Sequence, residues 1–357
     1  MTAADKLAHT EAVAAEPAEH DSAEHGGDLA AMRAAFPAAP RPWIDLSTGI
    51  NPWAYPVSRI PRSAWHRLPS ADDEQSVRLA AARYYDVDAA TTDVVLAPGS
   101  QALIQWLPRL RPHSRVAVVG PTYSEHARSW VAGGHDVLTV GADADALRDS
   151  DVVVVTRPNN PDGAVMPLLR LTELADRLQR RRGWLVIDEA FADVADARSV
   201  AATLPQASVV CLRSFGKFFG LAGGRLGVAL ARPPVSDALR AALGPWPAST
   251  PMLAIAARAF ADRAWIRRTR SRLKRAADRL DRIAVRAGLR LVGGTSLFRL
   301  YETGLAEPLF EHLTARGIYA RRFAAEPGWL RLGLIADAGG ERRLRRALAA
   351  FAWQQPH

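Results

Sequence analysis

The amino-acid sequence predicts an α/β protein with a large domain, in which a mostly parallel sheet lies between helices, and a small α+β domain. Between residues 92 and 230, short apolar runs alternate with helical segments, the pattern of strand–helix–strand units. After Pro233 the alternation gives way to a Pro-rich connection and then a mixture of helices and strands. The length of 357 residues and the hydrophobic content of 48% fit a globular protein larger than one ordinary domain.

Changes in composition divide the chain into four segments. Residues 1–24 are rich in Ala, Glu, Asp and His and are expected to form a loosely ordered tail. Residues 25–50 are expected to pack with the small domain, residues 51–250 to form the large domain, and residues 251–357 to form the small one. Because no cysteine or tight carboxylate cluster accompanies the histidines of the tail, no metal site is predicted.

The first residues after the tail are His25-Gly26-Gly27, and two glycines let the backbone approach a ligand closely. A short amphipathic helix is predicted over 28–39, and a short strand from Trp43 ends in a turn at Asn51-Pro52. The Asn51 amide either completes that turn or faces a cleft. A helix over 74–86 follows.

The first strand of the large domain, 93–97, leads into Pro-Gly99-Ser100-Gln101 and a helix. Backbone amides at the helix start, together with the Ser100 hydroxyl, form a cup for an anion. A serine that only caps the helix gives the same pattern, so this stretch alone leaves both interpretations open. The next strand, 115–120, ends in Pro-Thr-Tyr123 and places an aromatic ring where α/β sheets bind ligands.

Polar side chains follow two further buried strands. Residues 151–156 read as a strand covered on both faces and lead into the rigid loop Arg157-Pro-Asn-Asn160-Pro-Asp-Gly163. The strand from Trp184 ends at Asp188, whose carboxylate either satisfies the loop or is functional; its place at the carboxyl end of a strand favours function. The other elements predicted here are helices over 124–132 and 168–181 and a strand over 136–140.

Lys217 stands out because only three of the 46 basic residues are lysines, the other two being Lys6 and Lys274. A guanidinium stays charged in proteins, whereas a lysine amine can become neutral and form a Schiff base with a carbonyl substrate or with pyridoxal phosphate. Ser214 and Arg225 bracket this lysine between strands predicted at 208–212 and 225–230, and they suit a phosphate. A glycine-rich turn with an incidental lysine is the alternative interpretation.

The C-terminal part is predicted to begin, after a Pro-rich connection, with one long Arg-rich helix that ends at about Ala287. Strands are expected on either side of Gly293-Gly294 and a helix near Pro308. The last elements expected are strands over 318–321 and 329–334 and a helix over 340–353.

The net charge of +9 permits binding of nucleic acid or of anionic substrates. Much of the excess falls on predicted helices whose Arg residues alternate with Asp and Glu, so solvated helix faces are favoured and no nucleic-acid partner is predicted. No apolar run of membrane-spanning length and no secretory signal are recognised. The single cysteine, Cys211, excludes an internal disulfide and favours a reducing compartment, the cytoplasm.

Taken together, these motifs resemble the type I pyridoxal-phosphate-dependent enzymes, which have the aspartate-aminotransferase fold. The resemblance covers about residues 25–335 and is most specific in the combined spacing of its parts. Within that superfamily the chain is similar to the threonine-phosphate decarboxylases of cobalamin biosynthesis, which are related to histidinol-phosphate aminotransferases. The stretches that carry the resemblance are His25-Gly-Gly, Leu46-Ser-Thr-Gly-Ile-Asn-Pro-Trp, Gly99-Ser-Gln, Gly120-Pro-Thr-Tyr-Ser-Glu-His-Ala-Arg, Asn159-Asn-Pro-Asp-Gly, Asp188-Glu-Ala-Phe-Ala-Asp, Arg213-Ser-Phe-Gly-Lys-Phe-Phe-Gly-Leu-Ala-Gly, Gly293-Gly-Thr-Ser-Leu-Phe-Arg and Trp329-Leu-Arg-Leu-Gly.

The resemblance implies pyridoxal 5'-phosphate as cofactor and a role for each matching residue. Lys217 would hold the cofactor as a Schiff base and later protonate the substrate carbon. Asp188 would keep the ring nitrogen protonated, so that the ring withdraws electrons. Tyr123 would stack on the ring, and Asn160 would donate to its phenolic oxygen. The residues expected to hold the cofactor phosphate are Gly99, Ser100, Gln101, Ser214 and Arg225.

The same resemblance implies a substrate end with two anion sites. Arg331 would clamp the substrate carboxylate. Either Arg321 or Arg322 would contribute to a phosphate pocket, and a Gly-x-x-x-Arg pattern favours Arg321. The other residues expected at the substrate end are His25, Gly26, Asn51 and Asn160.

Three departures from the family pattern stand out. Many relatives place a tyrosine three residues after the aspartate that binds the ring nitrogen, and Phe191 is found there instead. The resemblance implies a homodimer, in which relatives use the tyrosine of a Tyr-Pro pair to reach the neighbouring subunit's cofactor phosphate. Leu68-Pro69 is found at that place, which leaves this cross-subunit bond in doubt. Gln101 stands where an acidic residue is common.

The function that the resemblance implies is decarboxylation of L-threonine O-3-phosphate to (R)-1-amino-2-propanol O-2-phosphate, for the side chain of cobalamin. Two alternatives stay open: an aminotransferase of the histidinol-phosphate type, and a non-catalytic regulatory protein on the same fold. Release of CO2 without a 2-oxo acid acceptor separates the first two. The presence of both Lys217 and Asp188 disfavours the third.

Overall fold

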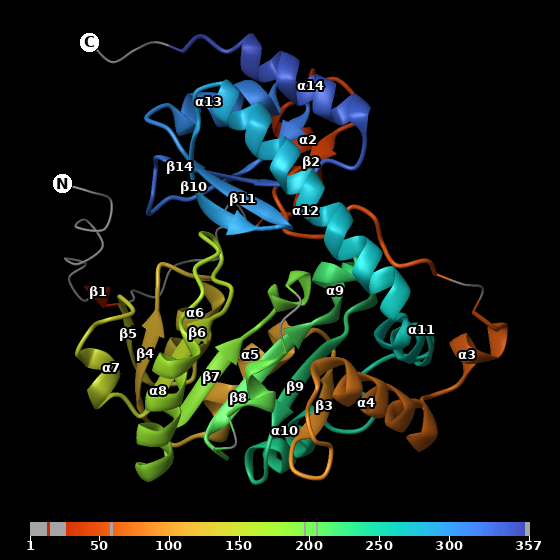
Figure 1. Cartoon of the computed structure of the whole chain (residues 1–357), viewed down its shortest axis with the longest axis vertical. Coiled ribbons are helices and arrows are strands. Elements are labelled where there is room, and N and C mark those ends of the chain that lie inside the picture. The colour runs from red at the N-terminus through yellow and green to blue at the C-terminus, as the bar shows by residue number, and fades with distance from the viewer. Residues whose placement is uncertain (1–12, 15–25, 58–59, 196–197, 205, 354–357) are drawn as a thin grey trace. The chain divides into compact units, whose positions relative to one another are not determined.

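The computed structural model describes residues 13–14, 26–57, 60–195, 198–204 and 206–353 (Figure 1). The tail predicted over 1–24 and His25 therefore lie outside the described residues, apart from the two-residue strand β1 (Val13–Ala14). The chain divides into two compact units. Unit 1 contains Tyr55–Asn160 and Ala164–Trp265, and unit 2 contains 26–54, Pro161–Gly163 and 266–353.

Unit 1 is built on an eight-stranded sheet with the order β1-β5-β4-β6-β7-β8-β9-β3. The strands from β5 to β8 pair in parallel, while β9 runs antiparallel to both of its neighbours, β8 and β3. The bounds are β3 (Asp93–Ala97), β4 (Arg115–Val119), β5 (Asp136–Val140), β6 (Val152–Thr156), β7 (Trp184–Asp188), β8 (Val209–Ser214) and β9 (Gly227–Ala231). This arrangement confirms the predicted mostly parallel sheet.

Alternation of side chains along the strands builds a core on each face of this sheet. On one face, valines such as Val154, Val186 and Val210 pack against Leu103 of α5 and Trp130 of α6. The helices of unit 1 are α3 (Arg62–His66), α4 (Ala71–Tyr85), α5 (Ser100–Trp106), α6 (Glu125–Ala132), α7 (Ala146–Asp149), α8 (Leu168–Arg180), α9 (Phe215–Phe218), α10 (Val235–Leu243) and α11 (Thr250–Ala261), with short 3-10 turns at Leu107–Leu110, Ala192–Val194, Val200–Ala202 and Ala222–Gly224.

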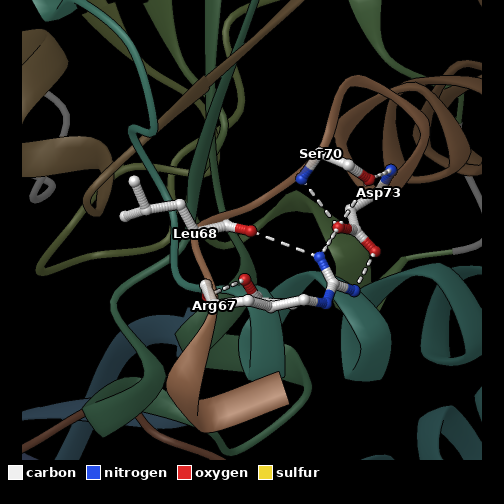
Figure 2. Close-up of polar contacts among 5 residues, drawn as sticks. Arg67, Leu68, Ser70 and Asp73 are labelled. Atoms are coloured by element: carbon white, nitrogen blue, oxygen red, sulfur yellow. Dashed lines mark hydrogen bonds and ion pairs between the residues drawn. The ribbon is translucent and has the colours of Figure 1, made fainter. Parts of the chain in front are cut away.

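Helix α4 begins at a polar cluster that fixes its first turn (Figure 2). Ser70 caps the helix by accepting a hydrogen bond from the Asp73 backbone N–H, and the Asp73 carboxylate accepts one in return from the Ser70 backbone N–H. Arg67 donates to both oxygens of that carboxylate. The Arg67 guanidinium holds the pKa of the Asp73 carboxyl well below its usual range. Because the pair is solvent-exposed, it contributes little to the stability of the fold. Its main effect is to order the chain near Leu68.

Unit 2 is the predicted α+β part. Its four-stranded antiparallel sheet has the order β10-β11-β14-β13, and a separate parallel pair joins β12 to β2. The strands are β2 (Ile44–Asp45), β10 (Arg290–Thr295), β11 (Phe298–Glu302), β12 (Ile318–Tyr319), β13 (Arg321–Arg322) and β14 (Trp329–Gly333). The helices are α2 (Leu29–Ala35), α12 (Arg263–Arg286), α13 (Ala306–Thr314) and α14 (Ala338–Ala349).

The prediction of one long Arg-rich helix was wrong, because α11 and α12 are separate. Helix α11 ends at Ala261, and the backbone of the following cap residue, Asp262, leaves the helical conformation. The Asp262 carboxylate then accepts a hydrogen bond from the Trp265 backbone N–H in the first turn of α12. An aspartate can end one helix and cap the next, and the apolar periodicity on both sides hides such a break. Across the described residues, no helix is long and apolar enough to span a membrane.

Candidate active site

The candidate residues of unit 1 gather because parallel strands deliver them at the same edge of the sheet. Asp188 ends β7 and Ser214 ends β8, whereas Tyr123 follows β4 and Asn160 follows β6. These four strands are neighbours in the sheet, so their carboxyl ends lie together, as Figure 1 shows. The structure thus brings together residues that the sequence places up to 91 positions apart, as Tyr123 and Ser214 are.

Asp188 is buried and its carboxylate is held in a defined orientation. One oxygen accepts a hydrogen bond from the Ala190 backbone N–H at 2.9 Å, and the other lies 2.9 Å from the His126 Nε2. His126 is 1% exposed, and its ring packs edge-on to Tyr123. The role of His126 was missed by sequence reasoning; its only signal was its place in the stretch that follows Tyr123.

We expect the His126→Phe variant to retain its fold but to bind and use its cofactor less well, because Asp188 loses a buried hydrogen bond. The loss of such a bond to a charged group is worth about 1.5–3 kcal/mol, or roughly 10- to 150-fold in kcat/KM. His126→Asn keeps an N–H donor and should recover part of the loss. Steady-state kinetics of both variants check this, and equal defects in Phe and Asn would contradict a hydrogen-bonding role.

Lys217 lies on α9, a single helical turn that begins directly after Ser214. Its side-chain nitrogen is 5.5 Å from the centre of the Phe191 ring. Behind the lysine, Phe215 and Phe219 stack with their ring centres 4.4 Å apart. The apolar support restricts the lysine backbone, and the Phe191 ring provides a dry, weakly attractive face for the ammonium.

The residues predicted to hold a phosphate meet through Gly227, which pairs with Ala97 on β3 and with Ser214 on β8. A methyl group on Gly227 would lie 2.3 Å from the Ser100 backbone nitrogen, so only glycine allows this approach. Gly99 has φ +85°, and a side chain there would lie 2.5 Å from the Arg225 Nη2. Arg225 itself has φ +48°, the left-handed region that costs free energy for a residue with a side chain.

Gln101, which follows Ser100, is held by two side-chain hydrogen bonds, and Asn160 lies in the loop after β6. The Tyr123 hydroxyl donates to the Gln101 side-chain oxygen at 3.2 Å, and the Gln101 amide donates to Glu125 at 2.8 Å. An amide at 101 can serve both neighbours, because it has a donor and an acceptor. Asn160 is half-buried and follows Asn159, whose side chain donates to the Pro121 carbonyl and accepts from Thr122.

In unit 2, Arg331 lies in the middle of β14 and is 7% exposed. It donates to the Ser47 carbonyl at 2.7 Å, and its guanidinium carbon lies 5.1 Å from the Phe298 ring centre. Arg321 is its direct partner across the β13–β14 pair. Burial, and secondarily the charge of Arg321, lowers the pKa of Arg331 to about 9. Keeping this guanidinium charged at neutral pH therefore costs free energy that a bound anion would offset.

The structure separates Arg321 from Arg322. Arg322 is exposed, forms an ion pair with Glu307 and packs over Phe310. Both arginines line a pocket with Asp28, Phe310 and Tyr319, among others, but Arg321 is the one that pairs directly with Arg331 across β13 and β14. Arg321 therefore stays the candidate for the substrate end.

Of the other predicted substrate residues of unit 2, Gly26 lies against Ser47 and Asn51 lies in a turn. A side chain at Gly26 would lie 2.3 Å from the Ser47 carbonyl oxygen, and the Gly27 N–H donates to the Ser47 hydroxyl. The Asn51 side-chain oxygen accepts a hydrogen bond from the Trp53 backbone N–H, so it completes the turn that the Asn-Pro pair predicted. His25 lies outside the described residues.

The chemistry of the unit 1 residues suits one kind of ligand. An amine, a buried carboxylate and a cup with an arginine can bind an aldehyde, a basic ring nitrogen and a phosphate, respectively. Within the described ranges, no group of three or more His, Cys, Asp and Glu residues could hold a metal ion. The donor set therefore fits an organic cofactor with these three groups.

Known proteins were compared with the chain as a whole. The model of the family "Aminotransferase class I and II" matches residues 44–351. The chain belongs to this family. It is 44% identical over 332 residues to the threonine-phosphate decarboxylase of Pseudomonas aeruginosa, a match that covers 92% of this chain and 98% of that protein. It is 43% identical over 333 residues to a protein of the same name from a Sinorhizobium species, covering 91% and 97%.

A solved structure of this family supports the fold. The chain superposes on histidinol-phosphate aminotransferase from Sinorhizobium meliloti, determined in complex with pyridoxal-5'-phosphate, with a TM-score of 0.76 and 21% sequence identity. The match covers 90% of this chain and 93% of that one. Together with the family match, this confirms the type I fold predicted from the sequence.

Proposed function

We propose that this protein is a pyridoxal-phosphate-dependent decarboxylase that converts L-threonine O-3-phosphate to (R)-1-amino-2-propanol O-2-phosphate and CO2, for the side chain of cobalamin. The observation that carries the proposal is the 44% identity to a threonine-phosphate decarboxylase across 98% of that relative. A second support is that Arg331 and Arg321, two basic residues, are direct partners across the β13–β14 pair, which suits a substrate with a carboxylate and a phosphate.

The residues of unit 1 fit pyridoxal phosphate. We propose that Lys217 binds its aldehyde, that Asp188 pairs with its ring nitrogen, and that Tyr123 covers its ring. Asn160 donates to the ring oxygen. The cofactor supplies an electron sink for the electron pair left on the substrate when CO2 departs. The residues that we propose for the phosphate are Gly99, Ser100, Gln101, Ser214 and Arg225, and the contacts of Gly227 with Gly99, Ser100 and Ser214 support this.

The residues of the protein select the bond that breaks. A bond to the substrate Cα breaks most easily when it stands perpendicular to the cofactor ring, so the enzyme controls the reaction by orienting the substrate. Arg331 for the carboxylate and Arg321 for the phosphate are anchors at separate points, and two anchors prevent rotation of the substrate. When the Cα–carboxylate bond has broken, the Lys217 amine delivers a proton to Cα. The alternative reaction, amino transfer, needs the Cα–H bond upright instead.

The assay is release of CO2 from threonine phosphate by the purified protein with pyridoxal phosphate. We expect CO2 without any 2-oxo acid, and far slower turnover of unphosphorylated threonine, because the remote phosphate supplies binding energy that enforces the pose. Amino transfer from histidinol phosphate to a 2-oxo acid, without CO2 release, would support the aminotransferase alternative. Equal rates with threonine and threonine phosphate would refute the substrate assignment.

We further propose that the protein acts in the cytoplasm, since its single cysteine, Cys211, is buried and suits a reducing compartment. We also propose that the protein is a homodimer. Large apolar side chains are exposed next to the start of α4: Trp65 is 67% exposed and Leu68 is 61% exposed. Figure 2 shows the Leu68 side chain pointing away from the Arg67–Asp73 pair. Exposed apolar side chains close together mark interaction surfaces, and a second copy of the chain is the proposed partner.

Changing Leu68 or Trp65 to glutamate should weaken this dimer, because each places a charge in the proposed interface. Light scattering should give the mass of a dimer for the unmodified protein and a lower mass for the variants at micromolar concentration. Leu169→Glu is the control, because Leu169 on α8 is also exposed, at 73%. A monomer that decarboxylates at full rate would contradict the dimer.

A further inference from the structure

Three buried charged side chains lie together behind β7 and β8, and the proposed reaction uses none of them. Arg213 is 2% exposed, Glu189 is 0% and Asp193 is 3%. The Arg213 Nε lies 3.2 Å from a Glu189 carboxylate oxygen, an ion pair without hydrogen-bond geometry, whereas the Arg213 Nη1 donates a hydrogen bond to an Asp193 oxygen at 3.3 Å. Burying three charges is costly, so their retention calls for an explanation beyond stability.

Strand alternation places this cluster on the face of the sheet opposite the candidate cofactor residues. Val186 and Leu212 belong to the core under α5 and α6, and Asp188, two residues after Val186, reaches His126 of α6 on that same face. Arg213 alternates with Leu212 and therefore points to the other face, where its guanidinium lies 4.4 Å from the ring centre of Tyr85 on α4.

Each member of the Arg213–Glu189 pair is bonded directly to a proposed cofactor residue. Glu189 follows Asp188, and Arg213 precedes Ser214, which leads into the turn that carries Lys217. Asp188 on β7 pairs with Leu212 on β8, and Glu189 and Arg213 are the residues that follow them. The Glu189 backbone N–H donates to the Leu212 carbonyl at 2.8 Å, so the backbone pairing continues to this position.

Both sides of the pair are anchored to the surrounding structure. The Ser199 hydroxyl donates to one Glu189 oxygen at 2.5 Å, and the Val200 backbone N–H donates to the other at 3.2 Å. Arg213 is held between the Tyr85 ring and the two carboxylates. Neither side chain can shift without losing a hydrogen bond in a site that water does not reach, so the pair resists sliding of one strand end past the other.

We propose that Arg213 and Glu189 are positioning residues for the cofactor site: their buried ion pair fixes the ends of β7 and β8 relative to each other, and with them the Asp188 carboxylate and the Lys217 amine. Two apolar side chains of the same size would fill the space but would tolerate small displacements, whereas separating the buried charges of Arg213 and Glu189 costs free energy in a site that water does not reach. The proposal rests on the assignment of Lys217 and Asp188 to the cofactor.

Two isosteric variants separate positioning from burial of charge. Glu189→Gln and Asp193→Asn each remove one carboxylate charge beside Arg213, at 3.2 and 3.3 Å. Only Glu189 is attached to the end of β7, since Asp193 lies on the 3-10 turn Ala192–Val194. The measurements are the dissociation constant for pyridoxal phosphate by absorbance titration, the pH midpoint of the visible absorbance of the bound cofactor, kcat and KM, and the melting temperature.

We expect Glu189→Gln to weaken cofactor binding by roughly tenfold, equivalent to about 1.4 kcal/mol, and to shift the pH midpoint of the absorbance. Asp193→Asn should lower the melting temperature as much as Glu189→Gln does. It should leave the dissociation constant and the pH midpoint close to those of the unmodified enzyme. Equal changes in both variants, or an unchanged absorbance profile in a folded Glu189→Gln, would overturn the proposal.

Arg213→Lys is the second variant, for use if Glu189→Gln does not fold. It keeps the charge but loses the planar fork, so the same shift in the pH midpoint is expected, and a profile like that of the unmodified enzyme would count against positioning. Failure of the underlying site assignment looks different. If Lys217 does not bind the cofactor, borohydride will still fix a label on Lys217→Ala, whatever the Glu189 variant does.

Discussion

Lys217→Ala is expected to abolish decarboxylation, with a loss in kcat of at least roughly 10³-fold, because the amine both holds the cofactor and delivers the proton to Cα. The same variant should lose the covalent label that borohydride fixes on the unmodified enzyme. Its visible absorbance should become that of free or loosely bound pyridoxal phosphate. Turnover, label stoichiometry and absorbance are measured on the same preparation.

Lys274→Ala is the matched control for this experiment. Lys274 lies on the exposed face of α12, where it pairs with Asp278 at 3.1 Å, and its side chain is 76% exposed. Its loss should change neither activity nor label, and it should cost little stability, because exposed ion pairs contribute about 0–1 kcal/mol. A label that persists in Lys217→Ala and disappears in Lys274→Ala would reverse the assignment.

Arg331→Ala is expected to have the second largest effect, and on a different measurement. Loss of a buried cation that binds an anion costs about 2–5 kcal/mol, roughly 30- to 5,000-fold in kcat/KM. The cofactor absorbance should stay unchanged, because every residue proposed to hold the cofactor belongs to unit 1 and Arg331 belongs to unit 2. The fold should tolerate the change, because Arg331 is a buried charge and burial lowers its pKa, so its removal relieves a desolvation cost.

Arg322→Ala is the control for the arginine variants. Arg322 lies next to Arg321 on β13, the strand that pairs with the strand of Arg331. Arg322 is exposed and paired with Glu307, so its loss should change kcat/KM by less than about threefold. Arg321→Ala should instead raise the KM for threonine phosphate. It should also reduce the ratio of kcat/KM for threonine phosphate to kcat/KM for threonine. Should Arg322→Ala produce the larger defect, the assignment of the phosphate site to Arg321 would fail.

The sequence by itself determined the local elements and the order of the chemistry. Runs such as 93–97 and 136–140 gave strands with the predicted bounds, because an apolar run between polar turns has few other stable conformations. The alternation of these strands with helices implied a parallel sheet, and a parallel sheet collects Tyr123, Asn160 and Asp188 at one edge. Lys217 could be singled out because arginine is used almost everywhere else.

The tertiary structure alone decided which distant groups meet. His126 and Asp188 are 62 residues apart, and no local pattern links them. Gly227 joins β3 to β8 through an antiparallel register that strand periodicity does not reveal. The difference between Arg321 and Arg322 depends on which face of the sheet each side chain lies on, because one residue along a strand reverses the side-chain direction.

The break between α11 and α12 and the Arg213–Glu189 pair were also beyond sequence reasoning. Asp262 could cap a helix or lie within one, and only the surrounding packing selects between the two. A glutamate after Asp188 and an arginine before Ser214 have no periodicity to connect them. Register, capping and buried pairing are set by many weak contacts made at once across the fold, whereas apolar periodicity and residue chemistry are properties of the local chain.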